Sequence, residues 1–160
     1  MADGQRLDPY RGYNFRVTVN GKGSLGGTMA FKKVSGLNME VEAVEYREGT
    51  DVATVRKLPG LAKFDNIVLE HGITDDASLI EWMQEIVNLT QESGLPADGD
   101  FRAEVIIELQ NRNQEVIREW TLTAAWPCKL TISDFEATSS DVIIEGMELC
   151  HEGWSSATVG

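Results

Sequence analysis

The sequence predicts a mainly β fold: an antiparallel barrel or sandwich with one α-helix and a long hairpin arm. Short segments that alternate apolar and polar residues recur along the chain, with turn residues about every ten positions. Only one segment, about residues 75–90, has the periodicity of a helix. The chain has 160 residues, 42% of them hydrophobic and 25% charged, which suits one domain with its own core.

The first strands are joined by a glycine-rich loop. Two candidate strands are YNFRVTV and MAFKKVSGL, and NGKGSLGG (residues 20–27) lies between them. This loop lacks the GxGxxG and GxxxxGKS/T spacings of phosphate-binding loops, so we interpret it as a flexible connection. The next segment, NMEVEAVEYREG, alternates with Met39, Val41 and Ala43 on one phase. A further strand candidate is KFDNIVLEHG.

A hairpin over residues 44–60, VEYREGTDVATVRKLPG, is unusually polar. It reads as two strands and a turn, yet its few apolar residues are scattered among charged ones and form no core-facing side. Such a hairpin gains little by packing on its own domain, because it would remove little apolar surface from water. We expect an arm that lies against a partner, and a solvated hairpin is the alternative.

The single helix is predicted within TDDASLIEWMQEIVNLTQESG. Its apolar residues recur at three- and four-residue steps and would face the core: Leu79, Ile80, Trp82, Met83, Ile86 and Val87. Thr74 or Asp75 can cap its start. Gly94 and Pro96 follow the periodic run and would end it. We expect this helix to plug or flank the barrel.

The second half of the chain contains the clearest strand, FRAEVIIELQ. Its alternate apolar residues face one way: Phe101, Ala103, Val105, Ile107 and Leu109. A turn, NRNQ, leads into EVIREWTLTAAW, where the adjacent Val116 and Ile117 predict a bulge or a change of sheet. Pro127 is expected to end this strand.

The last segments are KLTISDFEA and SSDVIIEGMELCHEG. The latter carries apolar residues on both phases, with Val142 and Ile144 on one and Met147 and Leu149 among those on the other. We therefore expect this strand to be covered on both sides. Residues 152–160 are expected to form a short exposed tail.

The formal net charge of −12 is concentrated in the second half of the chain. Residues 1–80 carry 10 Lys and Arg against 11 Asp and Glu, a net of −1, whereas residues 81–160 carry 4 against 15, a net of −11. A surface this acidic repels phosphate backbones, so we expect no sequence-specific nucleic-acid binding. No apolar run approaches the roughly 20 residues of a membrane span. The N-terminus also lacks a signal-peptide core, so we expect no membrane anchor and synthesis in the cytoplasm, with export by another route as the alternative to retention there.

The sequence contains no motif that predicts catalysis. Neither GxSxG nor HExxH occurs, and the acidic residues alternate with apolar ones, as on a solvated sheet face. Cys128 and Cys150 lack CxxC spacing and are expected to be free, buried thiols. A zinc site with His71 and His151 can be drawn, but no pair has metal-motif spacing. We predict that the protein is not an enzyme and has no cofactor and no metal site.

Four segments resemble, in this order, the tail tube proteins of contractile phage tails: DPYRGYNFRVTVNG, FKKVSGLNMEVEAVEYREG, VRKLPGLAKFDNIVLEHGIT and REWTLTAAWPCKLTISDFEATSSDVIIEGMELCHEGW. The likeness is greatest to the tube proteins of phage-tail-like extracellular contractile injection systems, and it runs from Pro9 to Trp154. Its most specific parts are VSGL with VEYREG, the RKLPG turn, and AWP with the terminal EGMELCHEG.

The resemblance implies a structural protein with a single tail-tube domain over residues 1–160, including an N-terminal arm (1–9) and a C-terminal tail (152–160). It implies that six copies form a ring, that rings stack into a hollow inner tube, and that a contractile sheath drives this tube through a target envelope. Further implied partners are baseplate and hub proteins, tape-measure and cap proteins, and protein cargo in the lumen. The subunit would be assembled in the cytoplasm into an injection particle or a virion tail.

The same resemblance points to the hairpin as the contact surface. Contacts between subunits or rings are expected at the stretch that best matches the family: Glu45, Arg47, Glu48, Arg56, Lys57, Leu58 and Pro59. The acidic and basic members of this set would give a complementary interface. Two other functions are open as alternatives: a phage tail tube that conducts DNA, and a monomeric small-ligand-binding β-barrel. Only a tube subunit should form rings or stacks as its concentration rises.

Overall fold

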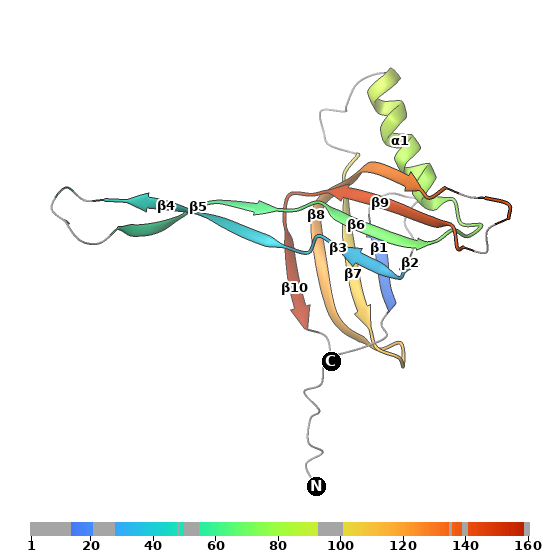
Figure 1. Cartoon of the computed structure of the whole chain (residues 1–160), viewed down its shortest axis with the longest axis horizontal. Coiled ribbons are helices and arrows are strands. Elements are labelled where there is room, and N and C mark those ends of the chain that lie inside the picture. The colour runs from blue at the N-terminus through green and yellow to red at the C-terminus, as the bar shows by residue number, and fades with distance from the viewer. Residues whose placement is uncertain are drawn as a thin grey trace, which may run out of the picture.

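Ten strands and one helix make up the part of the chain that the computed structural model describes. Figure 1 shows a barrel, a two-stranded arm that projects from it, and a helix beside it. The described residues are 14–20, 28–47, 49, 55–92, 101–134, 136–138 and 141–158. The predicted mainly β fold with a single helix is confirmed. Within these ranges no helix is long and apolar enough to cross a membrane.

Eight strands form one antiparallel sheet in the order β2-β1-β7-β8-β9-β6-β3, with β10 beside β8. Their bounds are β1 Asn14–Asn20, β2 Thr28–Phe31, β3 Lys33–Ser35, β6 Ile67–Gly72, β7 Ala103–Gln110, β8 Val116–Ile132, β9 Ile144–Cys150 and β10 Trp154–Thr158. Only Lys32 separates β2 from β3, and its backbone N–H donates to the carbonyl of Glu70 in β6 at 3.0 Å. The sheet therefore closes on itself through this bend and forms a barrel.

Strand β8 is the longest, with 17 residues, and it links the two halves of the barrel. Its first half pairs with β7 and β10, and its second half pairs with β9. Ile117 is an extra residue opposite the step from Leu109 to Gln110. The bulge predicted at Val116 and Ile117 is therefore confirmed.

The prediction that Pro127 ends this strand is wrong. Pro127 lies within β8, opposite Leu149. The register then shifts to Lys129 opposite Glu148, so Cys128 is an extra, bulged residue. A bulge already interrupts the ladder of hydrogen bonds, so the missing N–H of a proline is tolerated beside it.

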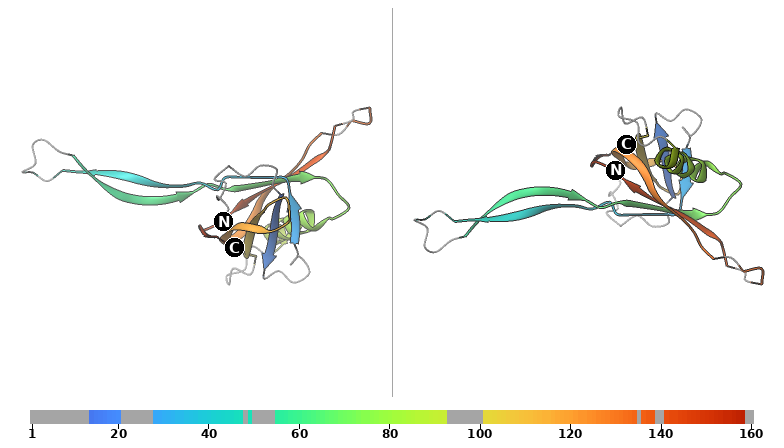
Figure 2. Two further views of the ribbon diagram at one scale, coloured as in Figure 1. Left: turned by 90° about the horizontal axis from the view of Figure 1, so that it is seen from below. Right: turned by 90° about the horizontal axis from the view of Figure 1, so that it is seen from above.

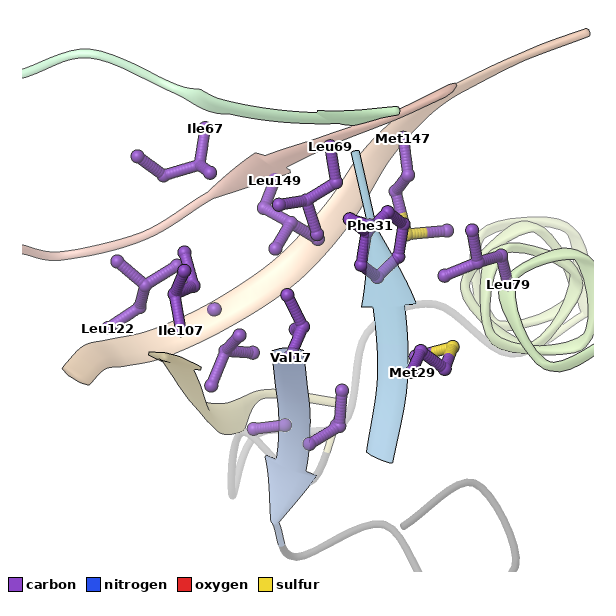
Figure 3. Packing of buried hydrophobic residues seen from close by; sticks show 14 of the residues in the cluster. Val17, Met29, Phe31, Ile67, Leu69, Leu79, Ile107, Leu122, Met147 and Leu149 are labelled. Carbon is purple, nitrogen blue, oxygen red and sulfur yellow. The ribbon is translucent and has the colours of Figure 1, made fainter. Parts of the chain in front are cut away.

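Apolar side chains fill the barrel interior, as Figure 3 shows. The fully buried members come from most of the barrel strands: Val17, Phe31, Ile67, Leu69, Val105, Ile107, Leu122, Met147 and Leu149. The alternation predicted for FRAEVIIELQ is confirmed from Phe101 to Ile107, where the inward-facing residues are buried and those between them are more exposed, whereas Leu109 is only half-buried. The interior is a packed core, as in small barrels whose side chains meet at the axis.

Helix α1 (Ser78–Glu92) flanks the barrel. Leu79 and Trp82 are buried and belong to the same core cluster as the barrel residues. The helix starts three residues later than the predicted start at 75. The carbonyl of Ala77 accepts the first helical bond, and Oδ1 of Asp76 accepts the backbone N–H of Ser78 at 3.0 Å, a role that neither Thr74 nor Asp75 takes.

The end of the chain pairs with the barrel. The sequence predicts an exposed tail over residues 152–160, but Trp154–Thr158 form β10, in register with β8 from Trp154 opposite Leu122 to Thr158 opposite Arg118. Trp154 packs against the core, whereas the other four residues of β10 are exposed.

The two cysteines lie on the neighbouring strands β8 and β9 and are free, half-buried thiols. The Sγ of Cys128 donates to the carbonyl of Glu148 at 3.4 Å. Burial, followed by the neighbouring Cys150, raises the pKa of Cys128 to about 12. Among the described residues, no three histidine, cysteine or carboxylate side chains come together as a metal site.

At pH 8, Cys128 is expected to react with iodoacetamide far more slowly than an ordinary thiol. Only the thiolate is nucleophilic, and a pKa of about 12 in place of the ordinary 9.0 lowers the thiolate fraction about thousandfold. Mass spectrometry of the labelled peptide over time measures the rate, with free cysteine as the reference. A rate within about threefold of free cysteine would contradict the protonated state.

Candidate assembly surface

The arm consists of β4 (Met39–Tyr46) and β5 (Arg56–Phe64), which pair antiparallel. Every residue of β4 is exposed, and so is every residue of β5 except the half-buried Phe64. Figure 1 and Figure 2 show a long ribbon that leaves the barrel on one side. The prediction that the hairpin over residues 44–60 does not pack on its own domain is confirmed for its described residues, and residues 48 and 50–54 lie outside them.

A β-bulge in β5 sets the side-chain pattern of the arm. The register moves from Val41 opposite Ala62 to Ala43 opposite Pro59, so two residues, Gly60 and Leu61, lie opposite the single residue between Val41 and Ala43. A Cβ at Gly60 would lie 2.8 Å from Cγ2 of Val44 on the facing strand. Glycine therefore permits the close approach of the two strands at this point.

The bulge gives the arm two different faces, because residues paired across the ribbon share a side. One side, here called the apolar face, carries Met39, Val41, Ala43, Pro59, Ala62 and Phe64 and, further from the barrel, Glu45 and Lys57. The other side, here called the mixed face, carries Glu40, Glu42, Val44, Tyr46, Arg56, Leu58, Leu61 and Lys63. Among the described residues of 44–60 both faces carry charged side chains, as the sequence predicts, and the apolar side lies in the half nearer the barrel, outside that range. Simple alternation along β5 does not reveal that side, because the bulge changes the phase.

Aromatic contacts fix the base of the arm on the barrel. The ring of Phe64 lies 5.9 Å from that of His151 and 6.2 Å from that of Trp154, centroid to centroid. Nε2 of His151 donates to the carbonyl of Asp65 at 2.7 Å, and its Nδ1 accepts the N–H of Gly153 at 3.1 Å. His151 therefore connects the outgoing end of the arm to the turn between β9 and β10.

The two connections of the arm also pack against each other. Nδ2 of Asn38, before β4, donates to Oδ2 of Asp65, after β5, at 3.0 Å. Gly36 has φ +92°, and a Cβ there would lie 2.0 Å from the carbonyl oxygen of Asn66. Only glycine fits this backbone conformation and this contact. The arm is therefore solvent-exposed along its length but held in a defined direction.

The structure brings six of the seven predicted contact residues together in the outer part of the arm. Glu45 lies opposite Lys57 on the apolar side, whereas Arg56 and Leu58 belong to the mixed face. Arg47 directly follows β4, and Glu48 lies outside the described residues. Leu61, which does not belong to the predicted set, is the most exposed large apolar side chain among the described residues, at 72%.

Known proteins provide an independent comparison. The T4-like virus tail tube protein gp19 family matches residues 11–155. A chain of the PVC sheath–tube complex of an extracellular contractile injection system, in the extended state, is 27% identical over 96% of this chain and 95% of its own, with a TM-score of 0.75. No curated protein matches the sequence.

Two further solved structures extend the comparison. A chain of the anti-feeding prophage tube-terminating cap is 26% identical, covers 99% of this chain and 100% of its own, and has a TM-score of 0.74. Hcp1 from Salmonella typhimurium is 13% identical over 92% of this chain and 87% of its own, with a TM-score of 0.54, and shares the fold alone.

Proposed function

The chain belongs to the T4-like virus tail tube protein family, and we propose that six copies close into a ring and that rings stack into the hollow inner tube of an injection apparatus. The protein is a tail tube protein of contractile injection systems, so its role is structural. The proposed tube carries cargo and is driven through a target envelope when a surrounding sheath contracts. We assign no catalytic role to any residue.

The observation that carries this proposal is the exposed arm. Among the described strands, β4 and β5 pair only with each other, so each has one edge without a neighbour. Exposed edges and exposed apolar residues favour pairing with other chains, and closure of a ring removes the free edges. Arms that join sideways would line a lumen with one side and contact neighbouring subunits with the other. Glu45, Arg47, Glu48, Arg56, Lys57, Leu58 and Pro59 are the proposed contact residues.

The packed interior favours the tube over a small-ligand barrel. A ligand-binding barrel of this size keeps a cavity at its axis, whereas side chains such as Val105, Ile107 and Leu122 occupy that position here. The proposed domain is a single one over residues 1–160, in agreement with a family match that spans residues 11–155.

The proposed partners follow from the similar chains. One of them is part of a sheath–tube complex and another of a tube-terminating cap. We propose contacts of the assembled tube with a sheath, a baseplate and hub, a cap and a tape-measure protein, and a lumen that holds protein cargo. The two chains that are 27% and 26% identical come from particles of the injection type, which favours that setting over a DNA-conducting phage tail. Synthesis and assembly are assigned to the cytoplasm.

Negative-stain electron microscopy over a range of concentrations, with light scattering on the same samples, tests the proposal. We expect six-fold rings with a central hole, alone or stacked. Strict monomers at every concentration, also after addition of baseplate components, would overturn it.

A further inference from the structure

A notch lies on the barrel surface at the end of β6 and the start of β9. It is a hollow of about 310 Å³ with a largely apolar lining to which His71, Gly72, Val142 and Ile144 contribute. Val142, just before β9, is 70% exposed and Ile144 is 44% exposed, so the described residues do not supply the cover expected on this side. A Cβ at Gly72 would lie 3.3 Å from Cγ1 of Val142, so glycine keeps the notch open.

Two buried polar atoms beside the notch lack hydrogen-bond partners among the described residues. Nε2 of His71 lies 3.8 Å from Oε2 of Glu145, which is 1% exposed, and neither this Nε2 nor Oε1 of Glu145 has a hydrogen-bond partner among the described residues. At the rim, Nζ of Lys33 lies 3.8 Å from Oε2 of Glu70, whereas Lys32 has no such ion pair in the described part of the chain. The notch therefore combines an uncovered apolar surface with one lysine, Lys32, that has no ion pair among the described residues.

The mixed face of the arm has the complementary properties. Leu61, Val44 and Leu58 are exposed large apolar residues that lie around the bulge. Two acidic residues of the arm stand opposite lysines, Glu40 opposite Lys63 and Glu45 opposite Lys57. Glu42 instead lies opposite the bulge formed by Gly60 and Leu61, so it has no basic residue across from it. The mixed face thus offers apolar side chains beside one carboxylate, that of Glu42, with no basic residue directly opposite it.

The arm and the notch lie at opposite ends of the molecule. In Figure 1 and in both views of Figure 2 the arm leaves the barrel on one side, and the ends of β6 and β9 that border the notch lie on the other. An arm held in this direction cannot enter the notch of its own chain. A contact between two different surfaces is head-to-tail, so it joins successive copies into a ring or a stack.

We propose that the mixed face of the arm of one subunit docks into the notch of a second copy, with Leu61 against Val142 and Ile144 and with Glu42 beside Lys32. Burial of these apolar side chains supplies the attraction, and the charge pair fixes the register. The proposal rests on the proposed function, because it names the surface on the neighbouring subunit that receives the arm.

Charge reversal tests the pairing. Glu42→Lys and Lys32→Glu are each expected to raise the concentration needed for half-assembly about tenfold, and the double variant is expected to restore it to within about twofold. Both side chains are exposed, so circular dichroism and thermal unfolding should be unchanged. Lys129→Glu, an exposed residue outside the notch, is the matched control and should leave assembly unchanged. A double variant that is impaired by the product of the two single effects would overturn the pairing.

Cross-linking tests the contact directly. With both native thiols replaced by serine, the variant with Leu61→Cys and Val142→Cys is expected to give dimers and higher products with a short bis-maleimide. Leu61→Cys with Ala157→Cys, on the exposed strand β10, is the control and should not. If rings form but the first pair does not cross-link, the docking is wrong and the proposed function stands. If the wild type forms no rings, the proposed function fails, and cross-linking at high concentration still decides whether the arm enters the notch.

Discussion

Deletion of most of the arm is expected to abolish rings and stacks while leaving the barrel folded. In the variant, residues 42–61 are removed and Val41 is joined to Ala62 through an Asn-Gly turn, which suits a two-residue hairpin between paired positions. All the described residues that are removed are solvent-exposed, so little apolar contact within the chain is lost. Electron microscopy and light scattering should show monomers only. The midpoint of thermal unfolding should shift by less than about 4 °C.

A matched control places a similar turn elsewhere. Arg112→Asn with Asn113→Gly changes the β7–β8 turn to the same dipeptide and keeps the arm, so assembly should be retained. Rings formed by the shortened variant would contradict the assignment of the arm as the assembly surface. A shortened variant that no longer folds would contradict the independence of the barrel from the arm.

Two identical substitutions are expected to have opposite consequences at two leucines. Leu149 is fully buried in the core, whereas Leu58 on the arm is 51% exposed. Leu149→Ala should lower the free energy of unfolding by about 2–5 kcal/mol, because it removes buried methyl groups and leaves a cavity. Leu58→Ala should change it by less than about 0.5 kcal/mol. Urea unfolding at concentrations below the onset of assembly measures both values.

The effects of the two substitutions on assembly should be in the opposite order to their effects on stability. Leu58→Ala is expected to weaken assembly, because its side chain leaves water only when a neighbouring subunit covers it. Leu149→Ala should assemble normally at temperatures where it remains folded. Equal loss of stability in the two variants would mean that the arm packs on its own barrel.

Local sequence patterns are sufficient to predict the strands and the helix that bury one side in the core. Core-facing residues follow from the alternation in residues 101–107 and from the helical steps between Leu79 and Ile86. The side chains that face the core recur with the regular period of a strand or a helix. The polar hairpin was also identified correctly as an arm without a place on its own barrel. The family resemblance then indicated the tube function, and the match over residues 11–155 confirmed the family.

Patterns failed where a bulge changes the period. Pro127 remains within β8 because Cys128 is bulged beside it, and the apolar face of the arm exists because Gly60 and Leu61 share one facing residue. Whether a residue is bulged depends on the strand opposite, which can lie far away in the sequence. The proposed contact residues could therefore be assigned to the arm from the sequence, but they could not be divided between its two faces.

The sequence by itself determined the fold class, the single helix, the exposed arm and the family, because these follow from local periodicity and from motifs that occur in order. Only the tertiary structure decided the direction of the arm and the position of the notch. Phe64 packs against His151 and Trp154, and Lys32 lies near His71, through contacts between residues distant in the chain. Such contacts depend on how the closed barrel brings strand ends together, and no local pattern of residues encodes them.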